Sequence, residues 1–163
     1  MKIHFIQTGG TIDKVYPMGL MARDYEIREP AFMEMIRIWN PNFEYSYSEI
    51  LKKDSLDIDD KDREKILKEC KTIDVDRIVI THGTDTMVDT AKVLSQIKDK
   101  TIVLTGSFSP FIFKTTDAEL NFASAVIAAQ LKGSGIYITM NGKIYEWDKV
   151  EKNKSGDMFI EKH

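Results

Sequence analysis

The stretch of residues 78–87 restricts the fold of this chain more than any other. It opens with the apolar, β-branched run Ile78–Ile80, passes through a glycine and reaches Thr84 and Asp85. Such a run suits a strand buried on both faces, and a glycine permits the tight turn after it. Thr84 and Asp85 then either cap a helix over residues 84–97 or serve a site, because open α/β sheets bind ligands beyond the carboxyl ends of their strands.

The rest of the chain alternates strand-like and helix-like segments. Strands are expected over residues 3–6, 43–51, 78–80, 101–104 and 135–140. Helices are expected over residues 30–39, 59–71, 84–97 and 117–131. A hairpin turning at Asn141 and Gly142 follows, and the tail from Trp147 shows no clear element. The alternation predicts one α/β domain over residues 1–163, doubly wound and Rossmann- or flavodoxin-like, with a mainly parallel sheet and helices on both faces.

Composition narrows the classes of protein that fit. The 163 residues are 42% hydrophobic and 30% charged, which is typical of a globular domain. A net charge of −3 gives no basic footprint for nucleic acid, and no apolar run approaches a membrane span of about 20 residues. Met1–Phe5 lacks the features of a signal peptide, and the single cysteine, Cys70, fits a core position. We therefore expect a cytoplasmic protein with a small-molecule partner, and neither nucleic acid nor a membrane.

Polar residues gather where the expected strands end. They are Thr11, Ser55, Thr84, Asp85, Thr105 and Ser107. Parallel strands place their carboxyl ends along one edge of a sheet. These hydroxyls and the carboxylate are therefore predicted to share one site.

The first of these strand ends carries a glycine pair, Gly9 and Gly10. Such a loop can cradle phosphate, but the lysine of a phosphate loop and the third glycine of a dinucleotide fingerprint are both missing. What remains is a turn that presents the hydroxyl of Thr11. The long loop over residues 13–29 that follows is predicted to be a mobile lid.

The chemistry open to such a site is limited. No His, Cys and carboxylate cluster has metal-ligand spacing, and no cofactor is expected. His4 is read as structural, His163 is terminal, and His82 is either a base or a buried helper of its loop. Without a clear histidine base, a lysine can accept the proton while a carboxylate orients it and a threonine hydroxyl passes it on. Thr84, Asp85 and a lysine fit those roles.

Two motifs carry a resemblance to a known family. The segments TGGTI at residues 8–12 and THGTDTM at residues 81–87 resemble the two signature motifs of bacterial-type L-asparaginases. The resemblance continues in Asp54–Asp57, Leu104–Gly106, Asp117 with Asn121, and Met140–Gly142. It covers only the amino-terminal domain of that family, and short single-domain asparaginase-like proteins look most similar.

The resemblance implies an amidohydrolase. Thr11 would attack the side-chain amide carbon of L-asparagine or a related small amide, release ammonia and leave an acyl-enzyme for water to hydrolyse. Thr84, Asp85 and Lys152 would form the second catalytic group. Lys152 is assigned from the loose pattern DKVEK at residues 148–152. Lys149, inside this pattern, and Lys154, two residues beyond it, are the alternatives.

The resemblance also implies substrate contacts. Ser55 and Asp85 would hold the α-carboxylate and α-amino groups, and backbone amides near Thr11 and Thr84 would form an oxyanion hole. The remaining residues expected to line the site are Gly10, Leu56, Gly83 and Ser107. A lid tyrosine assists the nucleophile in the family; Tyr16 and Tyr25 both qualify, and Tyr16 is preferred because it follows Thr11 closely.

Two departures from the family pattern matter. Leu56 stands where the family has a polar or small residue, and the carboxyl-terminal domain that closes the site is absent. We therefore expect a homo-oligomer, most simply a dimer. One face of the helix over residues 117–131 is the candidate contact surface, and the alternative is that this face packs on the sheet. That face comprises Phe122, Ala125, Val126, Ala129 and Gln130. A non-catalytic binding module for a small amino acid or anion is the competing interpretation.

Overall fold

Six strands form the main sheet, in the order β4-β1-β5-β6-β7-β8. The computed structural model describes residues 1–17 and 24–162. The sheet comprises β1 (Lys2–Gly9), β4 (Glu44–Lys53), β5 (Arg77–Thr81), β6 (Thr101–Thr105), β7 (Gly135–Met140) and β8 (Lys143–Glu146). The strands pair in parallel, except that β8 runs antiparallel to β7. The predicted mainly parallel α/β fold is confirmed.

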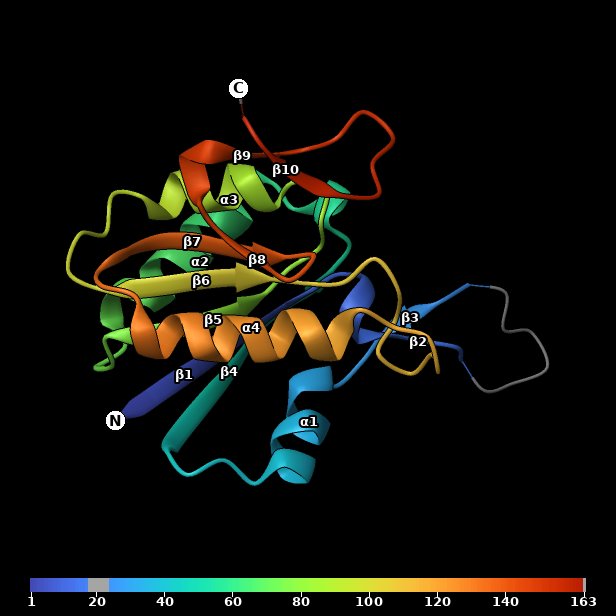
Figure 1. Cartoon of the computed structure of the whole chain (residues 1–163), viewed down its shortest axis with the longest axis horizontal. Coiled ribbons are helices and arrows are strands. Elements are labelled where there is room, and N and C mark those ends of the chain that lie inside the picture. The colour runs from blue at the N-terminus through green and yellow to red at the C-terminus, as the bar shows by residue number, and fades with distance from the viewer. Residues whose placement is uncertain (18–23, 163) are drawn as a thin grey trace.

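Helices cover both faces of this sheet (Figure 1). On one face lie α1 (Ala31–Trp39) and α4 (Ala118–Leu131), and on the other lie α2 (Asp60–Thr72) and α3 (Met87–Leu94). The central strand β5 feeds both layers, because Ile78 and Ile80 belong to the core under α2 and α3 while Val79 belongs to the core under α1 and α4. This explains why β5 reads as an uninterrupted apolar run. None of the described helices is long and apolar enough to cross a membrane.

The α4 face considered as a dimer surface lies inside the molecule, so the alternative interpretation, that this face packs on the sheet, is the correct one. Phe122, Ala125, Val126 and Ala129 are buried, and only Gln130 is partly exposed. The Phe122 ring lies 5.5 Å from the Phe5 ring and 5.8 Å from the Phe32 ring, measured between centroids. Packing within one chain therefore buries the apolar side chains of this face.

The helix after β5 begins later and ends earlier than expected. It starts at Met87 and ends at Leu94, and the Thr86 side chain makes no capping bond. The polar groups before it have another partner, because the Asp85 amide donates to Ser55 Oγ at 3.2 Å and Thr86 Oγ1 donates to the Ser55 carbonyl at 2.7 Å. Thr84 and Asp85 thus belong to a loop tied to Ser55, rather than to the first turn of a helix.

The tail is structured, contrary to expectation. After the turn η3 (Trp147–Lys149), β9 (Val150–Lys152) pairs antiparallel with β10 (Phe159–Glu161). Val150 and Phe159 are buried in the core under α2 and α3. Burial of these two side chains anchors the hairpin to the domain, and each strand is too short to show an alternating pattern.

The base of the predicted lid is a two-stranded ribbon, β2 (Lys14–Val15) with β3 (Glu26–Ile27). It follows the turn η1 (Thr11–Asp13), and the Arg28 amide donates to the Asp13 carbonyl at 3.2 Å to close it. Residues 18–23 of the lid, and the terminal His163, lie outside the described residues.

The structure confirms the roles expected of His4 and Cys70. His4 is structural, since its ring nitrogens lie 2.8 and 3.0 Å from the hydroxyls of Ser46 and Ser48 on the neighbouring strand. Cys70 on α2 is completely buried, and burial raises the pKa of its thiol to about 12. The thiol is therefore a core group, as predicted.

Candidate active site

The site is built where two glycine turns touch. Gly10 has φ +92, and a Cβ added to it would lie 2.4 Å from the backbone nitrogen of Gly83. A Cβ on Gly83 would in turn lie 2.6 Å from Ser55 Oγ. Neither glycine can carry a side chain without moving a neighbour. The absence of side chains at both positions therefore brings three strand-end segments together.

Hydrogen bonds fix these segments relative to each other. Thr8 Oγ1 on β1 donates to the Thr81 carbonyl on β5 at 2.8 Å, and the Gly10 amide donates to the Lys53 carbonyl on β4 at 3.0 Å. The turn that carries Thr11 is thus bonded to both neighbouring strands. Thr11 itself is partly exposed, and no hydrogen bond joins its hydroxyl to another described residue.

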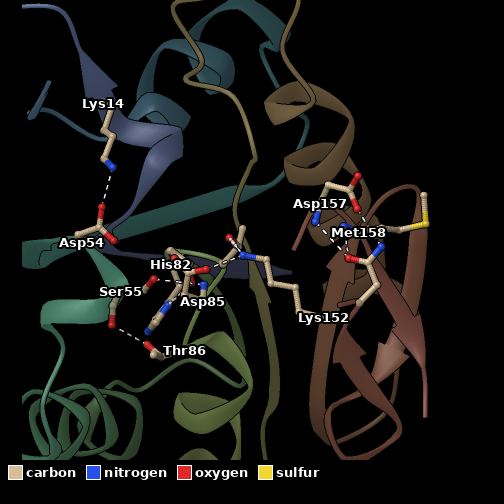
Figure 2. A network of polar contacts seen from close by, with 12 residues as sticks. Lys14, Asp54, Ser55, His82, Asp85, Thr86, Lys152, Asp157 and Met158 are labelled. Carbon is tan, nitrogen blue, oxygen red and sulfur yellow. Dashed lines mark hydrogen bonds and ion pairs between the residues drawn. The ribbon is translucent and has the colours of Figure 1, made fainter. Parts of the chain in front are cut away.

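Lys152 reaches the second turn from the tail hairpin. Its Nζ donates to Thr84 Oγ1 at 3.0 Å and to Asp85 Oδ1 at 2.6 Å; Figure 2 shows it pointing at Asp85. Its side chain is only 22% exposed. Lys149, the neighbouring alternative, instead pairs with Glu146 at 2.6 Å. Among the expected site residues, Thr84, Asp85 and Lys152 therefore form one contiguous group.

Ser55 underlies that group from the turn η2 (Ser55–Asp57). It is completely buried, and its oxygens hold Asp85 and Thr86 as described above. The preceding Asp54 accepts a bond from Lys14 of the lid ribbon at 2.6 Å, and this bond is the main cause that lowers the Asp54 pKa (Figure 2). Leu56 is 73% exposed, so the departure from the family pattern places an apolar side chain in solvent.

His82 is a buried helper and not a base. Its Nδ1 lies 2.8 Å from the Gly83 carbonyl, and its Nε2 lies 2.8 Å from Thr90 Oγ1. Because a carbonyl only accepts, Nδ1 carries the proton and Nε2 accepts from Thr90. Burial lowers the His82 pKa to about 4, so the ring is neutral at pH 7 and supports the turn from within.

Two of the expected hydroxyls are directed into the fold. Thr105 Oγ1 donates to the Thr139 carbonyl at 2.9 Å, and Ser107 Oγ donates to the Ser109 carbonyl at 2.5 Å. Both residues are buried. They lie at the carboxyl end of β6 as expected, but their hydroxyls do not join the group around Lys152.

The two lid tyrosines share one aromatic cluster. The rings of Tyr16 and Tyr25 are 6.0 Å apart edge to face, and Tyr25 lies 6.1 Å from Phe113. The exposed fraction is 60% for Tyr16 and 47% for Tyr25. This geometry does not favour one of them over the other as the partner of Thr11.

Sequence reasoning missed a buried carboxyl beside the site, Asp13. It accepts from the Ala31 amide at 2.8 Å and from Gln7 Nε2 at 3.0 Å, and burial raises its pKa to about 7. It lines a cavity of about 560 Å³ under the lid ribbon, bounded also by α1 and Phe111. An aspartate inside a loop carries no periodic signal, so only the fold reveals this residue.

A parallel α/β sheet with hydroxyls, a carboxylate and a lysine at its carboxyl edge is an arrangement for handling small molecules. Comparison with known proteins gives the family: residues 2–159 match the family model described as Asparaginase, N-terminal. The chain belongs to the asparaginase family and corresponds to its amino-terminal domain.

Individual relatives agree. The protein from Haemophilus influenzae described as "Probable L-asparaginase periplasmic" is 35% identical over 94% of this chain and 46% of its own length. The thermostable L-asparaginase from Thermococcus kodakarensis superposes with a TM-score of 0.82 and 28% identity over 99% of this chain and 51% of that one. A structure from Campylobacter jejuni, described as a probable cytoplasmic L-asparaginase, gives a TM-score of 0.80 at 26% identity, over 97% of this chain and 50% of that one. The chain thus spans about half the length of these relatives.

Proposed function

We propose that this chain is an amidohydrolase that converts the side-chain amide of L-asparagine, or a related small amide, to the acid and ammonia. The observation that carries the proposal is the contact of Lys152 Nζ with both Thr84 Oγ1 and Asp85 Oδ1, beside the turn that presents Thr11. The relatives described above, which are L-asparaginases by name, support the choice of substrate.

The chemistry proceeds in two halves. Thr11 Oγ1 forms a bond to the amide carbon, the carbon–nitrogen bond breaks, and the hydroxyl proton leaves with the nitrogen as ammonia. Water then attacks the resulting ester, which releases the acid and restores the Thr11 hydroxyl. Thr84 and Lys152 relay protons between the attacking oxygen and the leaving group, and Asp85 orients the lysine. A lid tyrosine, with Tyr16 preferred over Tyr25, assists Thr11.

Substrate binding uses groups whose hydrogen-bonding capacity is not exhausted. Ser55 accepts from the Asp85 amide and keeps its own hydroxyl proton, which a substrate carboxylate would reach only when the loop that buries Ser55 opens. The second oxygen of Asp85 is available for a substrate ammonium group. The Gly10 and Asp85 amides already have acceptors. The amides of Thr11 and Thr84 are therefore the candidates for an oxyanion hole.

An ammonia-release assay with a panel of small amides tests the proposal. Thr11→Ala is expected to lower kcat/KM by about 10³-fold or more, because it removes the nucleophile, while Thr11→Ser retains part of the activity. Lys152→Met is expected to lower it by about 10²- to 10⁴-fold, the range typical of general acid–base groups. Lys154→Met is the matched control, because Lys154 lies two residues further along, is exposed, and is expected to retain full activity.

The same assay separates an enzyme from a binding module. If calorimetry shows that the wild-type chain binds L-asparagine while no amide in the panel releases ammonia, the catalytic proposal is contradicted and the binding module is supported. If Thr11→Ala binds L-asparagine with wild-type affinity but has lost turnover, the site binds and the nucleophile assignment holds.

We also propose that the chain works as a cytoplasmic homo-oligomer, most simply a dimer. The chain spans about half the length of the relatives described above. A second copy of the chain would cover the site edge, where contacts open to water are weaker electrostatically. Two-fold dimers are the commonest closed assembly. Sedimentation at micromolar concentration tests this, and a monomer with undiminished turnover would contradict it.

A further inference from the structure

The loop after β6 lies directly against Lys152. The Phe108 ring centroid is 5.4 Å from Lys152 Nζ and 6.2 Å from the Phe159 ring centroid. Lys152 and Phe159 face each other across the β9–β10 ladder. One aromatic side chain therefore touches both strands of the hairpin that supplies the lysine.

The backbone of Phe108 is fixed by Asp117, one residue before α4. The Phe108 amide lies 3.1 and 3.0 Å from the two carboxylate oxygens of Asp117, and the Ser109 amide lies 3.0 Å from one of them. Asn121 Nδ2 donates to Asp117 Oδ2 at 2.8 Å and to the Gly106 carbonyl at 3.0 Å. The loop around Phe108 is therefore held at both ends by α4.

The same polar chain continues into the hairpin. The Asn141 amide donates to Asn121 Oδ1 at 3.0 Å, and the Phe159 amide donates to Asn141 Oδ1 at 3.0 Å. Asn141 has φ +53, a left-handed conformation that asparagine tolerates. Asp117, Asn121 and Asn141 thus join the Phe108 loop to the strand opposite Lys152.

A lysine side chain is long and flexible, and its ammonium group has three donors. Thr84 and Asp85 each accept one of them. An aromatic face within about 6 Å attracts the cation and restricts where it can lie. We propose that Phe108 is a positioning residue, which holds the Lys152 ammonium against Thr84 and Asp85 by cation–π contact. The hydrogen bonds that link Asp117, Asn121 and Asn141 hold the ring against the hairpin. The catalytic consequence rests on the function proposed above, whereas the contact itself does not.

The test uses variants that separate the aromatic face from the apolar volume. Phe108→Leu keeps an apolar side chain and removes the ring, and Phe108→Tyr keeps the ring. In protein with ¹³C-labelled lysine, assigned with Lys152→Met, the Lys152 ε-methylene protons are expected to resonate upfield through the ring current. They are expected to move downfield in Phe108→Leu and stay in place in Phe108→Tyr.

Activity gives the second readout. Phe108→Leu is expected to lower kcat by about twofold to thirtyfold with little change in KM, the range that corresponds to a cation–π contact. Phe108→Tyr is expected to restore kcat. Equal losses in the two variants, or a Lys152 resonance that ignores the change to leucine, would overturn the proposal. If wild-type protein releases no ammonia, the proposed function fails, and the resonance alone still decides whether Phe108 positions Lys152.

A variant of the tether checks the mechanism of positioning. Asn141→Gly keeps the left-handed backbone and removes the acceptor of the Phe159 amide, whereas Asn141→Asp keeps an acceptor. The Lys152 resonance is expected to move in Asn141→Gly and to remain in Asn141→Asp. An unchanged resonance in Asn141→Gly would show that the tether does not hold the hairpin against the ring.

Discussion

The two glycine turns of the site differ in how far the protein itself completes them. In the turn after β5, Thr84 and Asp85 already hold Lys152, and Ser55 holds the loop from below. In the turn after β1, the backbone is bonded on both sides but the Thr11 hydroxyl has no partner among the described residues. One turn is preorganised, and the other presents a free hydroxyl.

This difference has a chemical reason. A proton relay works only when its members already stand within hydrogen-bond distance, so its groups satisfy each other. A nucleophile bonded tightly to its own protein would have to break that bond to attack. The turn after β5 is therefore suited to proton relay and the turn after β1 to nucleophilic attack. We expect changes at the Thr84 and Thr11 hydroxyls to affect stability to different degrees.

The largest effect is expected where the turns meet. Gly10→Ala places a Cβ 2.4 Å from the Gly83 backbone at φ +92, which should cost about 3–5 kcal/mol of the free energy of unfolding or prevent folding. Gly156→Ala is the matched control, because Gly156 has φ +76 with nothing within 4 Å, and should cost about 1 kcal/mol. Urea unfolding measures both. Similar losses would show that φ alone, and not the contact between turns, restricts Gly10.

The two buried groups beside the turns, Asp13 and His82, should change the free energy of unfolding in opposite directions as pH rises. Burial raises the Asp13 pKa from 3.8 to about 7, so the folded state binds its proton more tightly and stability falls as pH rises from about 4 to 7. Burial lowers the His82 pKa from 6.5 to about 4, so the unfolded state binds more protons and stability rises from about pH 4 to 6.5. At about 1.4 kcal/mol per pKa unit, the swings are about 4 and 3 kcal/mol and largely cancel.

Variants should reveal the two opposing slopes. Asp13→Asn removes the fall, so its stability relative to wild type should increase as pH rises from 4 to 7. His82→Asn removes the rise, so its relative stability should decrease over the same range. Urea titrations at several pH values measure both, and parallel curves for wild type and the Asp13 variant would contradict a buried, protonated Asp13.

The smallest effect compares the two hydroxyls directly. Thr84→Val leaves Lys152 Nζ without one acceptor and should cost about 1 kcal/mol of stability, whereas Thr11→Val removes no internal bond and should stay within about 0.5 kcal/mol. Both changes should nevertheless impair ammonia release. Equal stability losses would mean that the turns are equally organised before substrate binds.

The sequence predicted the structure correctly at positions where the local backbone or burial allows only one kind of residue. Ile78, Val79 and Ile80 are all apolar because successive side chains of β5 are buried on opposite faces of the sheet. Gly10 and Gly83 mark the turns because a larger residue would collide with a neighbour there. The contact of Thr84, Asp85 and Lys152 was predictable only through the family resemblance, because 68 positions separate Thr84 from the lysine.

The misses have physical reasons. Helix α4 is apolar nearly all round: Leu120 and Ile127 are exposed while Phe122 is buried, so periodicity cannot tell its inner face from its outer face. The three-residue strands of the tail are shorter than any detectable alternation. Phe108 and Asp13 act through neighbours that are distant in sequence, which no local pattern reports.

Because Lys152 lies on the β9–β10 hairpin, the thermal stability of the site is expected to differ from that of the whole fold. The two strands of this hairpin pair only with each other, and two side chains, Val150 and Phe159, anchor them in the core. Small peripheral units of this kind open at lower free energy than the sheet they rest on. On warming, turnover should therefore cease while circular dichroism still reports an intact sheet, so that activity measures a local opening and not global unfolding.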